Sequence, residues 1–137
     1  MYSYLDLPKV PTELILPLEE ILKLENIFGG ATDKYTIHEC QDDLRDFLQP
    51  LFPSHTKFRY QTLREGVPVH IDRGRTEAIN YLIDTGGDNV STVWYEYDWT
   101  TPFIEKVFQA HRWHKLQVDI YHGVSNIKTC RYAITVG

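Results

Sequence analysis

Cysteine is scarce in this sequence, and its scarcity excludes two kinds of architecture. The chain of 137 residues holds two cysteines, Cys40 and Cys130. Two cysteines cannot make the disulfide framework of a small secreted domain, nor a zinc site built from four thiolates. We therefore expect both to be reduced thiols that pack in the interior.

Long apolar runs and an excess of positive charge are also missing. No apolar run approaches the roughly 20 residues that a membrane-spanning helix needs, and residues 1–6 lack the basic and apolar regions of a signal peptide. We therefore expect a cytoplasmic protein without a membrane partner. The net charge is −5, and an acidic chain binds the phosphate backbone poorly, which argues against nucleic acid as a partner.

What the sequence does contain is enough apolar material for one core. Hydrophobic residues make up 42% of the chain and aromatic residues 13%. This composition is typical of a folded chain rather than a disordered one, and the length fits a single domain spanning residues 1–137. The unusual feature is six histidines in so short a chain.

The N-terminal third has the spacing of two amphipathic helices. Apolar residues recur at helical spacing over 18–28. Thr36 and Glu39 have the separation of a capping box, and apolar residues follow at helical spacing as far as Leu51. We therefore expect residues 1–53 to be mostly helical.

From residue 57 onward the pattern is that of β-strands. Segments rich in β-branched and aromatic residues alternate with turn signals such as Glu65-Gly66 and 86–89. No helical segment between them is long enough for a parallel βαβ crossover, so an antiparallel sandwich or barrel is expected, with the helices packed on it in one α+β unit. The predicted strands are 57–64, 67–72, 76–84, 91–98, 106–113, 115–121 and 129–136.

Two histidines and one aspartate are spaced as a metal site on strands requires. His70 and Asp72 are two residues apart in a predicted strand, so their side chains point to the same face. A third ligand has to come from a distant strand, and His122 is the best candidate. Two histidines and one carboxylate leave three coordination positions open, as in the facial triad of non-haem Fe(II) oxygenases. These three residues are therefore the candidate catalytic metal ligands.

An arginine on a mostly apolar strand is the second unusual feature. Arg131 lies nine residues after His122, within the predicted strand 129–136. Burying a guanidinium is costly unless it is paired, and its planar fork suits a carboxylate. Facing the same cavity as the metal, Arg131 would hold the far carboxylate of a dicarboxylic keto acid.

Together these residues resemble the Fe(II)/2-oxoglutarate-dependent dioxygenases, specifically their prolyl-hydroxylase-like branch. That family carries His-x-Asp, a distal histidine, and an arginine or lysine further along. The chain has all four in that order: His70, Asp72, His122 and Arg131. Tyr60, ten residues before the first histidine, and Gly66 between them match the family as well, and so does the segment 75–87. The resemblance covers residues 58–137.

The resemblance implies a fold and an activity. The fold would be a double-stranded β-helix over residues 57–137, a jelly roll like that of cupins, mainly β, with residues 1–53 supporting the outer face of its major sheet. The cofactor would be Fe(II), with 2-oxoglutarate as cosubstrate and O₂ as oxidant. The activity would be hydroxylation of an unidentified primary substrate, an amino-acid side chain (free or in a peptide or protein) or a small molecule.

The resemblance also implies the residues that bind the cosubstrate. Arg131 would bind the far carboxylate of 2-oxoglutarate, with Tyr60 on the same group. Asn80, on the strand after His-x-Asp, would point toward the cosubstrate or the substrate. Many relatives have a serine or threonine two residues after the arginine, where this chain has Ala133. The hydroxyl of Tyr60 or Thr135 would replace it.

The remaining histidines offer one rival metal pair. His111 and His114 would face opposite sides of a strand and would share a face only on a helix, and no carboxylate nearby completes a site. His38 and His55 are expected at the surface, in a helix and a loop.

A second function stays open at this point. A cupin-like module that binds a metal or ligand without oxygenase activity would have the same fold. The enzyme is favoured because a purely structural jelly roll needs neither the three metal ligands nor Arg131. Exposed strand edges also make a homodimer plausible.

Overall fold

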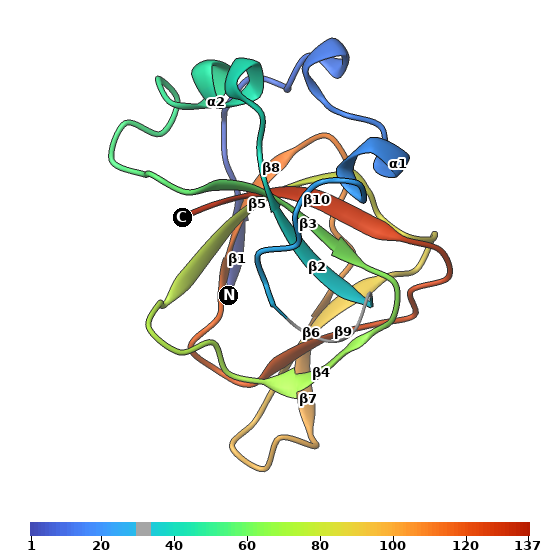
Figure 1. Ribbon diagram of the computed structural model, residues 1–137. Coiled ribbons are helices and arrows are strands. Elements are labelled where there is room, and N and C mark those ends of the chain that lie inside the picture. Colours follow the sequence, from blue (N-terminus) through green and yellow to red (C-terminus); the bar gives the residue numbers. More distant parts are fainter. Residues whose placement is uncertain (30–33) are drawn as a thin grey trace.

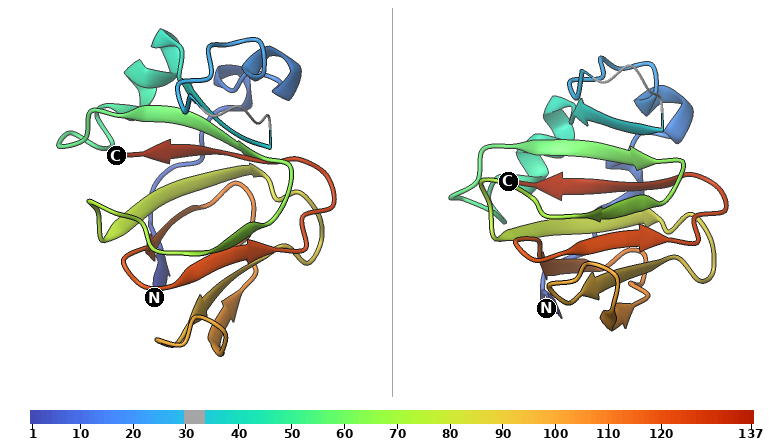
Figure 2. Two further views of the ribbon diagram at one scale, coloured as in Figure 1. Left: turned by 60° about the horizontal axis from the view of Figure 1, so that its bottom comes forward. Right: turned by 90° about the horizontal axis from the view of Figure 1, so that it is seen from below.

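Two antiparallel β-sheets face each other in the computed structural model, which describes residues 1–29 and 34–137 (Figures 1 and 2). The larger sheet consists, in spatial order, of β1 (Tyr2–Tyr4), β8 (Trp113–Gln117), β5 (Glu77–Asp84), β10 (Arg131–Val136), β3 (Phe58–Leu63) and β2 (Tyr35–Glu39). The smaller sheet consists of β4 (Val67–His70), β9 (His122–Ser125), β6 (Ser91–Tyr95) and β7 (Pro102–Lys106). This is the predicted mainly β jelly roll.

Both faces of the larger sheet are covered, because alternate residues of its strands point to opposite sides. In β10, Ile134 and Val136 are buried on the outer face, against the N-terminal segment. Ala133 packs on the inner face with Trp94 of the smaller sheet. The inner face therefore closes the barrel, and the outer face belongs to a second apolar core.

Short helices cover the outer face, as expected (Figure 1). They are the 3-10 helix η1 (Thr12–Leu14) and the α-helices α1 (Leu18–Ile21) and α2 (Asp42–Leu48). Ile21, Leu44 and Leu48 are fully buried in the outer core with Phe58 and Ile134. None of the helices in the described part of the chain is long and apolar enough to cross a membrane.

The prediction that residues 1–53 are mostly helical is wrong. The helix expected over 18–28 ends at Ile21, and the capping box of Thr36 and Glu39 lies on strand β2. The next helix begins only at Asp42, with Gln41 as its N-cap. Local spacing favoured a helix, but the unpaired edge of β3 offered a full ladder of backbone hydrogen bonds to this segment.

His38, expected at the surface, is buried on β2. Its Nδ1 hydrogen-bonds with the carbonyl oxygens of Leu24 and Glu25 at 3.2 and 3.0 Å, and its Nε2 with the Thr36 hydroxyl at 2.8 Å. Thr36 in turn bonds the hydroxyl of Thr62 on β3. A satisfied buried histidine therefore ties β2 to the loop after α1.

Several strand boundaries also differ from prediction, among them those of the strands expected over 67–72 and 91–98, which end at His70 and Tyr95. The strand expected over 106–113 is wrong, because β7 ends at Lys106 and β8 begins at Trp113. The strand expected over 115–121 stops at Gln117, and β9 begins at His122, where no strand was predicted. The short runs carry apolar residues on both faces, so their pattern alone does not locate their ends.

Both cysteines are free, as expected. Cys40 is buried, and burial raises the pKa of its thiol to about 12. Cys130 is half-buried, and burial raises its pKa too. Neither thiol is therefore an activated nucleophile at neutral pH.

Candidate metal centre

The structure brings the three predicted metal ligands together in the smaller sheet. His70 ends β4 and His122 begins β9, and the two are paired across these strands. Asp72 was predicted within the strand of His70 but lies two residues beyond its end, where its backbone N–H donates to the carbonyl oxygen of Val118 at 2.9 Å. One ligand atom from each side chain lies within 4.8 Å of the others. Within the described part of the chain, this is the one such cluster.

Two glycines allow the histidine-bearing strands to approach this closely. A Cβ at Gly66 would lie 2.7 Å from the carbonyl oxygen of Val124, and one at Gly123 would lie 2.7 Å from that of Val67. Real side chains do not tolerate such contacts with backbone atoms. The sequence therefore places glycine where β4 and β9 meet, and the two imidazoles end with their ring centroids 4.4 Å apart.

Backbone hydrogen bonds orient both imidazoles toward one point. The Nδ1 of His70 bonds the carbonyl oxygen of Pro68 at 2.8 Å, and the Nδ1 of His122 bonds that of Ile120 at 2.7 Å. A carbonyl oxygen can only accept, so each Nδ1 carries a proton and donates it. Each Nε2 then faces Asp72 in the apo protein, and it is the nitrogen that a metal would take, which is the usual arrangement of metal-binding histidines.

The carboxylate of Asp72 lies at the centre of the cluster. Its Oδ1 is 3.1 Å from Nε2 of His70 and 3.5 Å from Nε2 of His122. Its Oδ2 accepts from Nε and a terminal nitrogen of Arg75 at 2.9 and 2.7 Å. Arg75 therefore occupies one oxygen and leaves the other facing the two histidines.

The charges of the cluster suit a divalent cation. Burial alone would raise the pKa of the Asp72 carboxyl, but hydrogen bonds from the two histidines and from Arg75 outweigh burial and hold that pKa well below its usual range. The hydrogen bond to Asp72 is the main reason that the pKa of His70 is raised. The carboxylate thus stays ionised and attracts positive charge to the point where the Nε2 atoms meet.

An interior cavity of about 100 Å³ begins at these ligands and continues between the two sheets. Three of the residues that the sequence analysis proposed to bind a cosubstrate line it: Arg131, Asn80 and Thr135. The side chain of Arg131 is 7% exposed, and no carboxylate among residues 1–29 and 34–137 pairs with it. Burial lowers its pKa to about 10, so the guanidinium is still charged at neutral pH and lacks a counter-ion.

His114 lines the same cavity, and the sequence interpretation did not place it there. It is 1% exposed on β8, whereas His111 lies in the preceding loop at the surface. The rival metal pair of these two histidines therefore does not form. The signal that would have placed His114 is its alternation with Leu116 and Val118, two apolar residues on the inward face.

Most of the buried polar atoms that lack a hydrogen-bond partner in the described residues lie at this cavity. Four buried side-chain polar atoms lack a hydrogen-bond partner in the described part of the chain, and three of them are Oδ1 of Asn80 and both ring nitrogens of His114. Such groups are rare in native proteins, and their presence commonly marks an absent ligand, ion or water. With the unpaired Arg131, they give the cavity the donors that an anionic ligand needs.

Tyr60 is not brought to this cavity. Its ring is buried in the outer core, and its hydroxyl donates to Oε1 of Gln41 at 2.8 Å and accepts from the Leu16 backbone N–H at 3.2 Å. The neighbouring residue Gln61 faces inward instead and donates to the hydroxyl of Tyr35 at 2.8 Å. The expected contact of Tyr60 with the cosubstrate therefore has no geometric support.

Replacing Tyr60 by phenylalanine tests this placement. We expect the free energy of unfolding to fall by about 1–2 kcal/mol, because two buried hydrogen bonds of the hydroxyl are lost. We expect the affinity for 2-oxoglutarate to stay at the wild-type value. Urea unfolding and calorimetric titration measure the two quantities, with Tyr35→Phe as the matched variant inside the cavity. A loss of affinity without a loss of stability would restore the original assignment.

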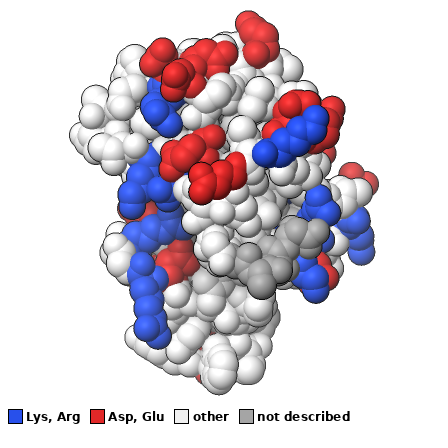
Figure 3. Space-filling view, viewed as in Figure 1, with Lys and Arg blue, Asp and Glu red and all other residues white. Residues whose placement is uncertain are grey.

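A groove beside the cavity carries positive charge. It has a volume of about 530 Å³ and shares Tyr35, Gln61, Arg75 and Thr135 with the cavity, so the two are neighbours. Lys57, Arg59 and Arg73 also line this groove. Figure 3 shows basic side chains along the side of the molecule where the C-terminus lies in Figure 1, whereas acidic ones gather around the helices.

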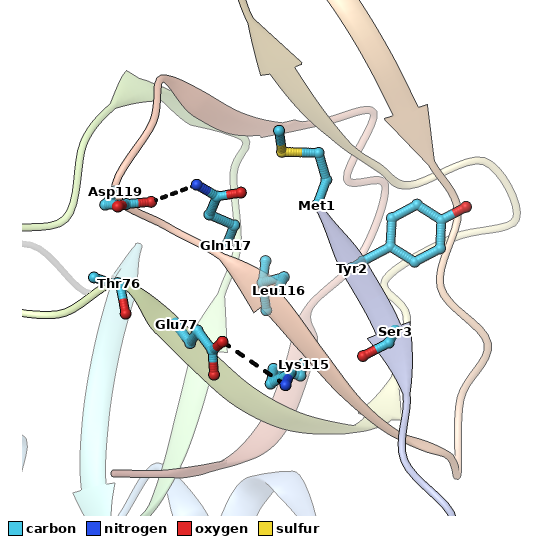
Figure 4. Close-up of a pocket in the computed structure, with 9 residues that line it drawn as sticks. All are labelled: Met1, Tyr2, Ser3, Thr76, Glu77, Lys115, Leu116, Gln117 and Asp119. Atoms are coloured by element: carbon cyan, nitrogen blue, oxygen red, sulfur yellow. Dashed lines mark hydrogen bonds and ion pairs between the residues drawn. The ribbon is translucent and has the colours of Figure 1, made fainter.

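A second hollow, of about 290 Å³, lies between β1, β5 and β8 (Figure 4). Its charged and amide side chains pair with each other. Lys115 lies 3.7 Å from Glu77, and Gln117 donates to Asp119 at 2.8 Å. The interior cavity, in contrast, contains buried polar atoms without hydrogen-bond partners. We therefore take the interior cavity as the functional site.

Comparison with known proteins shows the fold. No family model and no curated protein matches the sequence. The crystal structure of an oxidoreductase of the 2OG-Fe(II) oxygenase family from Burkholderia pseudomallei superposes with a TM-score of 0.60 at 8% sequence identity, over 86% of this chain and 73% of that chain. A cupin-like protein from Desulfovibrio desulfuricans superposes with a TM-score of 0.45 at 12% identity, over 84% of this chain and 95% of that chain. The chain thus shares the jelly-roll fold of an oxygenase of that family.

Proposed function

We propose that this protein is an Fe(II)- and 2-oxoglutarate-dependent oxygenase. His70, Asp72 and His122 would hold the metal, since two imidazole nitrogens and one carboxylate oxygen form the donor set of non-haem Fe(II) sites. When bound, Fe(II) would supply the binding and activation of O₂, with open positions for the keto acid. The prolyl-hydroxylase-like resemblance of the sequence favours an amino-acid side chain as the primary substrate.

One observation carries this proposal: a metal-ligand cluster and an unpaired buried guanidinium line the same small cavity. A metal site alone would fit many cupin-like proteins. Arg131 adds a fixed positive charge inside the barrel, where a charge without a partner is costly. A ligand with two anionic ends, one for the metal and one for the guanidinium, satisfies both sites at once. A dicarboxylic keto acid has this form.

The protein's own part in the reaction is binding and orientation. Arg131 would fix one end of 2-oxoglutarate, and the enclosed cavity would exclude water from the reacting atoms. In the overall reaction, one atom of O₂ enters succinate as 2-oxoglutarate loses CO₂. The other atom enters a C–H bond of the primary substrate as a hydroxyl group. The basic groove beside the cavity, which shares Arg75 with it, would be the approach for that substrate.

Anaerobic titration with Fe(II) and 2-oxoglutarate tests the proposal. We expect a weak visible charge-transfer band that needs both components, because a keto acid bound to Fe(II) absorbs there. We also expect 2-oxoglutarate to raise the melting temperature of the metal-loaded protein, as any ligand of the native state does. Admission of air should then yield succinate.

Glutarate is the matched control, because it has both carboxylates but lacks the keto group and should give no band. The absence of both the band and the melting shift would exclude the oxygenase. Metal binding without any response to 2-oxoglutarate would instead favour a cupin-like metal-binding module.

A further inference from the structure

We infer that His114 is a second recognition residue for the far carboxylate of the cosubstrate, acting beside Arg131 as an uncharged hydrogen-bond donor. The inference rests on the proposed function, because it concerns the same cavity. It adds a residue that neither the sequence pattern nor the resemblance assigned to cosubstrate binding. It also explains why the cavity contains a buried imidazole without a partner.

Sheet register places His114 in one row with the other candidate residues. His114 on β8 is paired with Asn80 on β5, and Asn80 is paired with Thr135 on β10. All three side chains line the cavity, and Arg131 enters it from β10 as well. The four residues therefore surround one part of the barrel interior from three adjacent strands.

The imidazole is held in one orientation. Its ring stacks on Phe108 with centroids 3.8 Å apart and an angle of 11° between the planes, and the ring of Tyr4 lies edge-on at 6.4 Å. Aromatic packing on this scale fixes the ring without using either nitrogen. The nitrogens are thus positioned in advance, and neither makes a hydrogen bond of normal geometry in the described structure.

The imidazole is also uncharged at neutral pH. Burial, and secondly the positive charge of Arg131, lower the pKa of His114 to about 3. A neutral imidazole carries one N–H donor and one acceptor nitrogen. An interaction with the backbone of Arg112 opposes the lowering of the pKa but does not reach hydrogen-bond geometry, and a carboxylate that pairs with Arg131 would supply a proper acceptor.

His38 shows what a structural histidine looks like in this fold. It is equally buried, yet both of its nitrogens have hydrogen-bond partners in the surrounding backbone and side chains. A histidine kept only for packing at position 114 would be disfavoured, because two unsatisfied polar atoms destabilise the apo protein. The contrast between the two histidines points to a ligand for His114.

A pair of keto acids separates this role from a structural one. Wild type, His114→Leu and His114→Gln are loaded with Mn(II), which supports binding without turnover, and titrated with 2-oxoglutarate and with 2-oxobutanoate, which lacks the far carboxylate. We expect His114→Leu to raise the Kd for 2-oxoglutarate by about tenfold or more, as for loss of a hydrogen bond to a charged group. The Kd for 2-oxobutanoate should stay unchanged, and His114→Gln, which keeps an N–H donor, should recover part of the loss.

The melting temperature of the apo protein gives a second readout. His114→Leu should melt at or above the wild-type temperature, because it removes two unsatisfied buried nitrogens at similar volume. The surface variant His111→Asn should change neither the affinities nor the melting temperature. A histidine that serves packing alone would lower the melting temperature on replacement and would leave the ratio of the two Kd values unchanged, and that result would overturn the inference.

The outcomes also distinguish this inference from the proposed function. If wild type binds 2-oxoglutarate more tightly than 2-oxobutanoate, and His114→Leu keeps the same ratio, the inference is wrong and the oxygenase proposal stands. If wild type binds neither keto acid, both are wrong.

Discussion

Replacing Asp72 by alanine is expected to abolish metal binding, with a rise in the Kd for Fe(II) or Mn(II) of at least about 100-fold. Loss of residues that only orient metal ligands already costs 10- to 100-fold in affinity, and Asp72 would be a ligand itself. Its Oδ1 lies between the two imidazoles, so no neighbouring side chain replaces it. Anaerobic calorimetric titration measures the loss, and metal content after purification checks it independently.

The same substitution is expected to change how stability depends on pH. In the folded apo protein the pKa of Asp72 lies below its ordinary value of 3.8. A carboxyl with a lowered folded-state pKa stabilises the fold above its unfolded pKa, and that contribution is lost as the pH falls through the folded pKa. Asp72→Ala should therefore destabilise the apo protein at neutral pH and flatten the loss of stability in acid. Urea unfolding from pH 7 down to about pH 2 measures both effects, because the contribution is constant at neutral pH and is lost from roughly pH 5 downward.

Asp119→Ala is the matched control for Asp72→Ala. Asp119 is an exposed aspartate three residues before His122, outside the ligand cluster, and its side chain accepts a hydrogen bond from Gln117. Its replacement should leave metal affinity unchanged. Unchanged metal affinity in Asp72→Ala would mean that the cluster is not the metal site, and His70→Ala would then be expected to have no effect either.

The cluster of His70, Asp72 and His122 could be predicted because its geometry is largely local. His70 and Asp72 are two residues apart on one short segment, and although the strand ends at His70, the hydrogen bond from the Asp72 backbone N–H to Val118 holds Asp72 close to it. His122 and Arg131 needed only to lie on strands that reach the same barrel interior. Such inferences do not depend on the exact ends of the strands, which the sequence located poorly.

Tyr60 and His114 could not be assigned correctly because both faces of the larger sheet are buried. Strand alternation shows that Tyr60 and Gln61 point to opposite sides, yet it does not say which side is the barrel interior. The helices cover the outer face with apolar residues, so an aromatic side chain such as that of Tyr60 is suited to either face of the sheet. For His114 the informative signal was its alternation on one strand with the inward-facing Leu116, and not its closeness in sequence to His111.

Replacing Arg131 by methionine is expected to weaken the binding of 2-oxoglutarate by about 100-fold or more. Removing one partner of a buried, hydrogen-bonded charge pair commonly costs 2–5 kcal/mol, and 1.4 kcal/mol corresponds to tenfold in Kd. Methionine has a similar length and fills irregular space, so the cavity should keep its shape. The affinity for 2-oxobutanoate and for the metal should be unaffected, since neither contacts the guanidinium.

The stability of the apo protein should change in the opposite direction. Arg131 is buried without a counter-ion in the described structure, and replacing such a charge by an apolar side chain is neutral or stabilising. We therefore expect Arg131→Met to melt at or above the wild-type temperature while it loses cosubstrate affinity. A lower melting temperature, with equal losses for both keto acids, would show that Arg131 supports the barrel rather than the ligand.

The double variant Arg131→Met, His114→Leu connects the two residues to one carboxylate. If both contact the same group, its free-energy loss for 2-oxoglutarate should be smaller than the sum of the single losses, because residues that share a partner are coupled. Two independent sites would give additive losses. The coupling therefore tests, with affinities alone, whether the unpaired guanidinium and the unpaired imidazole bind one anion.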